Sequence, residues 1–205
     1  YITNMIILNT HMLEPVWEYN FNKIMKYTEE IVKAMSILAD NPKTIFIGQA
    51  VEYEGTGLYD SLSHLPKNKR MELPVAEYLQ SGLANGMAIE GLIPVSTYPR
   101  WNFLLMGTDQ IVNHLDKFKS MSNGKLTPKV IIRVAVGSEQ PVDPQCQHKG
   151  NFSEAFRNMT TNTEIIELIE PEDILPAYTK ALNRKDNVNT ILVEFADYCK
   201  TKWKY

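Results

Sequence analysis

Apolar residues follow two alternating patterns along the chain, stripes at helical spacing and short continuous runs. From Phe21 they return every three or four residues until Asn41-Pro42, where the residue before proline avoids the α region. The same spacing predicts further helices at 58–64, 77–89, 101–120, 153–159 and 171–183. Runs bounded by turn residues predict strands at 44–47, 71–73, 92–97, 129–136, 164–169 and 190–195.

Strands that alternate with helices predict an α/β fold, a three-layer sandwich around a mostly parallel, doubly wound sheet. The most apolar runs are typical of strands buried on both faces. Residues 1–20 have no clear period, and we expect an N-terminal arm there and one folded domain over 21–205. Ligands of such sheets bind beyond the carboxyl ends of the strands, so the residues that follow each strand are the first candidates for a site.

Composition removes several classes of function. The net charge is −3, without the basic surface that nucleic-acid binding requires. No apolar run is long enough for a membrane span, and no secretion signal opens the sequence. The two cysteines, Cys146 and Cys199, make neither a disulfide framework nor a zinc site. We therefore expect a cytoplasmic protein with reduced thiols, a small-molecule substrate and no metal ligands of its own.

Three residues after predicted strands could bind a ring-shaped ligand at one edge of the sheet. Glu77 opens a helix after the strand at 71–73, Phe103 follows the strand at 92–97, and His148 lies in the loop after 129–136. Each also has an ordinary structural interpretation. An acid in a first helical turn can serve the helix dipole alone, an aromatic side chain on a helix is often part of the core, and a loop histidine is often only solvated.

Several longer segments resemble one known family. They are IGQAVEYEG (47–55), LPVAE (73–77), GLANGMAIEGLIPV (82–95), NFLLMGTDQIVNHLDKFKSMSNG (102–124), PKVIIRVAVG (128–137) and QHKGNFSEAF (147–156). Each is weak alone, but jointly they resemble the pyrimidine-binding domain of the transketolase superfamily, in particular the beta subunits of 2-oxo acid dehydrogenases. The resemblance covers about three quarters of the chain, from residue 46 to about 198.

The resemblance implies a thiamine-diphosphate site with specific roles for these residues. The glutamate at the position of Glu77 hydrogen-bonds N1′ of the cofactor's aminopyrimidine ring and promotes removal of the thiazolium C2 proton. Phe103 corresponds to the residue that stacks on that ring, and His148 to a group facing the substrate. We expect Gln49 and Tyr98 to be further contacts of the cofactor, so the catalytic candidates are Glu77 and His148.

Other features imply a partner chain. The family holds the diphosphate and its Mg²⁺ with a Gly-Asp-Gly motif, which this sequence lacks, and the family's C-terminal domain has no counterpart here. The resemblance thus implies an alpha-like subunit that holds the diphosphate and Mg²⁺, in a homodimer or a heterotetramer.

The substrate class and the role of the chain stay open at this stage. The chain has Gln49-Ala50 where the family usually has two acids, and Lys149-Gly150 where it usually has Ser-Gln. A subunit for 2-oxo acid decarboxylation or acyl transfer is the first expectation. The alternatives are half of a split transketolase-like or deoxyxylulose-phosphate-synthase-like enzyme, and a non-catalytic scaffold.

Overall fold

Six parallel strands form one twisted sheet in the order β2-β1-β3-β4-β6-β5. The computed structural model describes residues 16–137, 139, 143–186 and 188–195. The strands are β1 (Thr44–Gly48), β2 (Arg70–Glu72), β3 (Ile93–Tyr98), β4 (Ile131–Val136), β5 (Thr163–Leu168) and β6 (Asn189–Phe195). Each lies within two residues of a predicted strand. In this part of the chain the sheet is entirely parallel, which confirms the α/β prediction.

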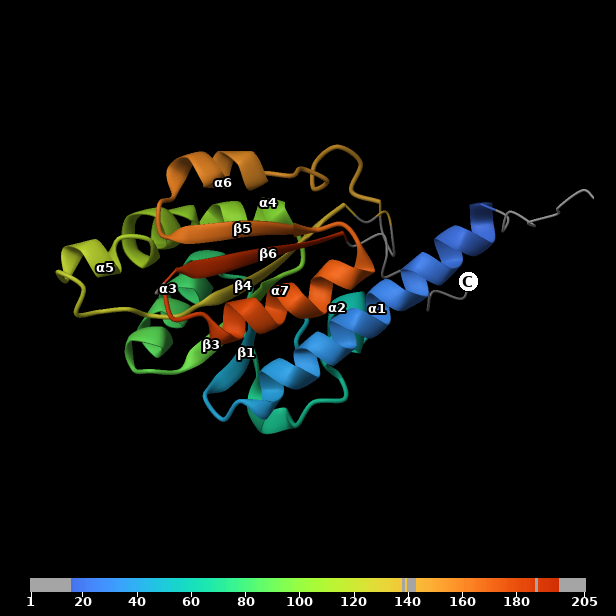
Figure 1. Cartoon of the computed structure of the whole chain (residues 1–205). Coiled ribbons are helices and arrows are strands. Elements are labelled where there is room, and N and C mark those ends of the chain that lie inside the picture. Colours follow the sequence, from blue (N-terminus) through green and yellow to red (C-terminus); the bar gives the residue numbers. More distant parts are fainter. Residues whose placement is uncertain (1–15, 138, 140–142, 187, 196–205) are drawn as a thin grey trace, which may run out of the picture.

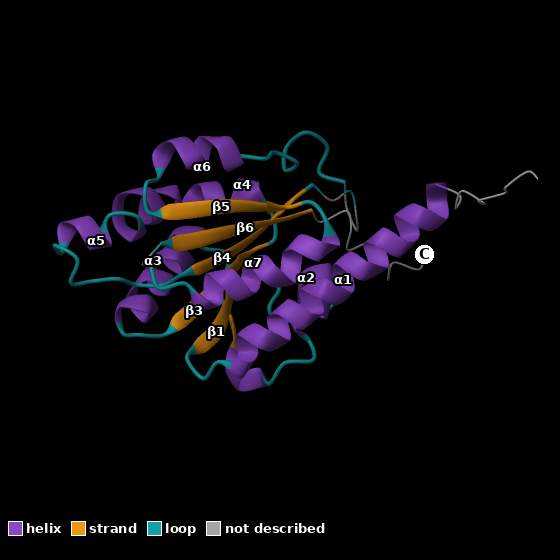
Figure 2. Ribbon diagram, viewed as in Figure 1, coloured by secondary structure: helices purple, strands orange, loops and turns teal. Residues whose placement is uncertain are grey.

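Helices cover both faces of the sheet and complete three layers (Figures 1 and 2). One layer contains α1 (Val16–Asp40), α2 (Gly57–Leu62) and α7 (Pro171–Asn183). The opposite layer contains α3 (Glu77–Ile89), α4 (Trp101–Leu104) and α6 (Ser153–Met159), with α5 (Phe118–Met121) after them. Short 3₁₀ turns cover η1 (Lys67–Lys69) and η2 (Leu105–Gly107), and η3 (Gln110–Leu115) is a π-helix. None of the described helices is long and apolar enough to cross a membrane.

Each layer has its own apolar core against the sheet. On the α1 side, one stripe of that helix is completely buried and packs along α7, as its helical spacing predicts: Tyr27, Ile31, Ala34, Met35 and Leu38. The opposite core joins α3, α4, η3 and α6 around Trp101 and Phe156, whose ring centroids lie 4.9 Å apart. The strands between the two cores are buried on both faces, which explains their apolar sequences.

A buried charged network crosses the α1 side of the sheet. Arg133 on β4 donates to both carboxylate oxygens of Glu194 on β6, at 2.7 and 2.9 Å, and also to the Ser61 hydroxyl at 2.8 Å. The Tyr178 hydroxyl on α7 donates to the same carboxylate at 2.5 Å. Burial and the neighbouring Glu194 raise the pKa of Tyr178 well above its ordinary value. This network ties two strands to α2 and α7.

The structure differs from the predicted elements in two places. Helix α1 begins at Val16, so residues 16–20 are helical and only 1–15 of the expected arm fall outside the described residues. The single helix predicted for 101–120 was wrong, because this stretch changes pitch from α to 3₁₀ and then to π. Helical spacing of apolar residues does not distinguish these pitches from one another. Within this stretch Gly107 lies close against α3, because a Cβ there would lie 2.2 Å from Ser81 Oγ.

Candidate functional site

The predicted site residues lie around the carboxyl ends of four neighbouring strands, β2, β1, β3 and β4. Gln49 directly follows β1, and Glu77 is the first residue of α3, five residues beyond the end of β2. The Gln49 side-chain amide donates a hydrogen bond of 3.1 Å to Glu77 Oε1. Among the described residues this is the one hydrogen bond found on the Glu77 carboxylate, which is partly exposed. The structure therefore brings Gln49 and Glu77 together and leaves acceptor capacity on the acid.

Gly48 explains how these two loops approach each other. Its φ of +144° is a conformation that side chains disfavour, and a Cβ there would lie 2.3 Å from the Thr97 carbonyl oxygen on β3. The Gln80 amide donates to that same carbonyl at 2.9 Å, so α3 and β3 both press against the end of β1. Only glycine allows this packing, and the chain leaves the sheet directly into Gln49.

Phe103 and His148 form a second contact at the same edge. Their ring centroids lie 5.0 Å apart at an angle of 51°. Phe103 is only partly buried and belongs to neither apolar core, while His148 Nδ1 is buried without a hydrogen-bond partner among the described residues. An aromatic face beside an orphaned ring nitrogen is suited to a planar ligand that offers both stacking and a hydrogen bond.

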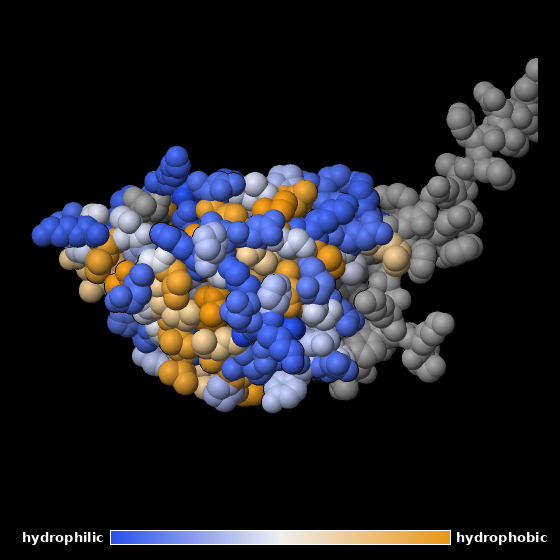
Figure 3. Space-filling view, turned by 90° about the horizontal axis from the view of Figure 1, so that it is seen from below, coloured by the Kyte–Doolittle hydropathy of each residue, from blue (hydrophilic) through white to orange (hydrophobic). Residues whose placement is uncertain are grey.

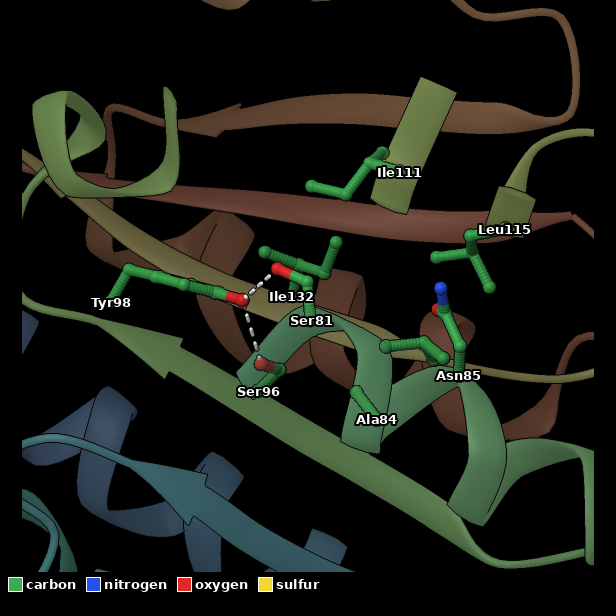
Figure 4. Close-up of a pocket in the computed structure, with 9 residues that line it drawn as sticks. Ser81, Ala84, Asn85, Ser96, Tyr98, Ile111, Leu115 and Ile132 are labelled. Carbon is green, nitrogen blue, oxygen red and sulfur yellow. Dashed lines mark hydrogen bonds between the residues drawn. The ribbon is translucent and has the colours of Figure 1, made fainter. Parts of the chain in front are cut away.

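Tyr98 lies beneath this edge and not on it. Its side chain is 1% exposed and points into the α3 core, where its hydroxyl contacts Ser81 at 2.6 Å and Ser96 at 3.2 Å (Figure 4). Burial raises the pKa of Tyr98 to about 12, so its phenol stays protonated in ordinary buffers. As placed, Tyr98 supports α3 from below, and its assignment as a cofactor contact stays a prediction.

The hydroxyls around Tyr98 form a directional chain that ends at Glu77. Ser81 donates its proton to the Glu77 carbonyl at 2.9 Å, so the Tyr98 hydroxyl donates to Ser81. Ser96 in turn donates to Tyr98, and the Gln80 amide donates to Ser96 at 3.1 Å. Such chains strengthen each other in a buried setting, so this one fixes the first turn of α3 on the sheet.

Sequence reasoning missed a residue that positions the His148 loop. The Asn102 side chain donates to the Gln147 carbonyl at 3.0 Å and accepts from the Gly150 amide at 3.3 Å, so it holds the loop on both sides of His148. Lys149 adds ion pairs with Glu139 and Asp143, at 2.9 and 2.8 Å. The one sequence feature that could have indicated this role for Asn102 is its position directly before Phe103.

Metal-binding chemistry has no support in the described part of the chain. No group of three or more histidine, cysteine, aspartate or glutamate side chains lies close enough there to hold an ion.

Comparisons with known proteins show which proteins this chain is similar to. No protein-family model matches the chain. The chain is 30% identical over 142 residues to the pyruvate dehydrogenase E1 component subunit beta of Saccharomyces cerevisiae, a match that covers 66% of this chain and 37% of that protein. A solved structure described as a split gene transketolase, an inactive beta4 tetramer, matches 84% of the chain and 50% of its own length, with a TM-score of 0.58 and 17% identity. The chain is thus similar in sequence to pyruvate dehydrogenase E1 beta subunits, and it shares its fold with the split gene transketolase.

A second solved structure has the same fold. Transketolase from Campylobacter jejuni matches the chain with a TM-score of 0.63 and 15% identity, over 84% of this chain and 27% of the transketolase. The domain thus spans a quarter to a half of the length of the proteins it matches. The activity, substrates and partners of those longer proteins do not follow from the match itself.

The edge of the domain fits one end of a heteroaromatic cofactor. Glu77 can accept a hydrogen bond from a ring N–H, the Phe103 ring offers a stacking face, and the orphaned His148 Nδ1 can pair with a polar group of a ligand. Among the described residues, no group of three or more histidine, cysteine, aspartate or glutamate side chains could hold the metal ion of such a cofactor. The residues that lie at this edge fit an aminopyrimidine ring.

Proposed function

We propose that this chain is the beta-like subunit of a thiamine-diphosphate-dependent enzyme that decarboxylates a 2-oxo acid or transfers its acyl group. The observation that carries the proposal is the Gln49–Glu77 hydrogen bond at the carboxyl edge of the sheet. The similarity to pyruvate dehydrogenase E1 beta subunits supports the same assignment.

Glu77 is the central catalytic residue in this proposal. When bound, thiamine diphosphate supplies a carbon nucleophile and an electron sink. The Glu77 carboxylate holds the proton at N1′ of the aminopyrimidine ring, while the Gln49 amide keeps that carboxylate oriented. Phe103 stacks on the ring, and His148, beside it, faces the substrate as a proton donor or carboxylate ligand.

An alpha-like partner chain completes the site by holding the diphosphate and Mg²⁺. The outer face of α3 is a suitable surface for a neighbouring subunit, because Tyr78 is 53% and Leu79 58% exposed, with Leu83 one turn further on. Apolar side chains (orange) gather left of centre on the face seen in Figure 3. Figure 1 labels α3 and β3 in the same left-hand part of the molecule. Exposed apolar patches of this kind favour a protein–protein contact, in a homodimer or in a heterotetramer with the alpha-like chain.

Exchange of the cofactor's C2 proton for deuterium tests this function directly. The chain is reconstituted with an alpha-like protein that carries the Gly-Asp-Gly motif, and exchange is followed by NMR after an acid quench. Glu77→Gln preserves size but cannot hold the shared proton, so exchange should slow by about 10²-fold or more. Glu90→Gln, at the other end of α3, is the matched control and should exchange like wild type.

The outcomes separate the possible roles. Equal exchange in Glu77→Gln and wild type would reduce Glu77 to a helix-terminal charge and refute the proposal. A complex that assembles but does not accelerate exchange, even with wild-type chain, would point to the scaffold role.

A split transketolase-like enzyme is the second candidate. It is favoured by the similarity to the split gene transketolase structure, whose description also names a chain separated from its other half. Both candidates predict the same Glu77 effect, so substrate decides between them. Turnover of 2-oxo acids supports the first candidate, and turnover of ketose phosphates supports the second.

A further inference from the structure

The Glu72 carboxylate organises the loop that carries Gln49. Glu72 ends β2 and accepts three consecutive backbone N–H groups from the loop after β1: Ala50 at 2.8 Å, Val51 at 2.7 Å and Glu52 at 2.8 Å. Three charge-assisted hydrogen bonds to one side chain make a strong and directional tether. Successive N–H groups converging on an anion form a nest, and here the chain's own carboxylate fills it.

The nest holds the backbone in a conformation that it would not otherwise adopt. Ala50 has φ of +58°, in the left-handed region that a residue with a Cβ rarely adopts. On the other side of Gln49, Gly48 is fixed by its contact with β3 and by its carbonyl, which accepts from the Leu73 amide at 2.8 Å. Gln49 is therefore the single residue between two constrained backbone positions.

We infer that Glu72 is a positioning residue that sets the Gln49 amide against Glu77. Its importance for catalysis rests on the proposed function, whereas its effect on Gln49 does not. Loss of the carboxylate would leave three neighbouring N–H groups without their acceptor and nothing to offset the left-handed Ala50. The loop would relax, and the 3.1 Å contact between Gln49 and Glu77 would be lost with it.

A merely structural role for Glu72 makes a different prediction. Glu72 lies on β2, at the edge of the sheet, and the carboxylate could serve only to fasten that strand. In that case its removal would lower overall stability but leave the Gln49–Glu77 contact intact in the folded protein. The side-chain amide of Gln49 distinguishes the two roles, because its NMR resonances report the hydrogen bond to Glu77 without any cofactor or partner.

The experiment records ¹⁵N–¹H spectra of the isolated chain for wild type, Glu72→Gln and the matched control Glu54→Gln, an exposed acid of the same loop. When Glu77→Gln is made in the otherwise wild-type chain, it should shift the Gln49 side-chain resonances. In Glu72→Gln those resonances should already lie near solvent-exposed values and no longer respond to Glu77→Gln. The backbone amides of 50–52 should also exchange with solvent at least about tenfold faster, the loss of roughly 1.4 kcal/mol of protection. The control should match wild type in every respect.

A second variant covers the case in which Glu72→Gln does not fold. Glu72→Asp keeps the charge but withdraws the carboxylate by one methylene, so amide exchange at 50–52 and the Gln49 resonances should both move part of the way. Gln49 resonances that stay at wild-type positions in a folded Glu72 variant, and still respond to Glu77→Gln, would overturn the inference.

A second readout links Glu72 to the reaction and separates this inference from the proposed function. In the reconstituted complex, Glu72→Gln and Gln49→Ala should each slow C2 exchange by about tenfold, and the double variant should be no slower than either. Additive losses would contradict action through Gln49. Should the wild-type complex show no accelerated exchange at all, the proposed function fails, while the spectra of the isolated chain still decide the role of Glu72.

Discussion

Replacing Arg133 with methionine should destabilise the domain far more than an ordinary surface substitution. Arg133 is 2% exposed and Glu194 4%, so the ion pair between β4 and β6 is shielded from water. Arg133→Met removes three of the donated hydrogen bonds and leaves the Glu194 carboxylate buried with the Tyr178 hydroxyl as its remaining described partner. Breaking a buried pair in this way costs about 3–5 kcal/mol.

Urea unfolding followed by tryptophan fluorescence measures that cost. With a slope of about 2–3 kcal/mol per molar urea, the midpoint should fall by about 1–2.5 M. The melting temperature should fall by about 6–20 °C for a chain of this size. Lys180→Met is the matched control, because Lys180 pairs with Glu164 on the surface and such pairs contribute about 0–1 kcal/mol.

A combined variant tests whether the penalty comes from the stranded charge. Arg133→Met with Glu194→Leu and Tyr178→Phe removes the charges and the hydroxyl together, and it should recover most of the stability lost by Arg133→Met alone. A loss below about 1 kcal/mol for Arg133→Met would refute the reasoning. So would a combined variant that is less stable than the single one, since apolar packing would then be the larger contribution.

Two further predictions concern residues that shape the sheet and its loops. Burial raises the pKa of Asp116, but hydrogen bonds from Lys117, Thr161 and Asn162 outweigh it, so the pKa lies below its ordinary value. The ionised carboxylate therefore stabilises the fold above about pH 4, and this stabilisation is lost as the pH falls through the folded-state pKa. Asp116→Asn should be less stable than wild type near neutrality, and its free energy of unfolding should fall less on acidification. Urea unfolding at about pH 5 and pH 3 measures both effects. Gly48→Ala should lower the free energy of unfolding by at least about 2 kcal/mol, because the added Cβ clashes with Thr97. Gly86→Ala has open space around the added Cβ, so it should raise the free energy of unfolding by about 0.5–1 kcal/mol. Thermal unfolding measures both.

Periodicity predicted the elements whose packing follows local sequence. Helix α7 has the predicted bounds, because Pro171 marks its first turn and its apolar residues form one buried stripe at helical spacing. The stretch 101–120 was mispredicted because its apolar residues keep a helical spacing, which does not distinguish an α-helix from the 3₁₀ and π turns of the structure. A spacing rule also has no term for contacts distant in sequence, such as the close approach of Gly107 to Ser81.

The site was predictable as a location and less so in its details. Parallel strands place their carboxyl ends at one edge, so Glu77, Phe103 and His148 had to lie on the same side of the sheet. Strand alternation also indicates that Ser96 and Tyr98 share a face, which explains why Tyr98 points under α3. The Glu72 tether could not be predicted, since it depends on a left-handed Ala50 that no sequence signal requires.

Helix α3 carries the candidate acid and the exposed apolar face at once, so docking of a partner could in principle disturb the site. The hydroxyl chain through Tyr98 argues against such dependence, because it fixes the Glu77 carbonyl to β3 by contacts that lie wholly within this chain. Glu72 on β2 in turn holds the loop that carries Gln49, through the backbone N–H groups of residues 50–52. Both members of the Gln49–Glu77 pair are thus oriented before any neighbour arrives. In the proposed complex, the partner would hold the diphosphate and Mg²⁺, and the geometry of the acid would not depend on it.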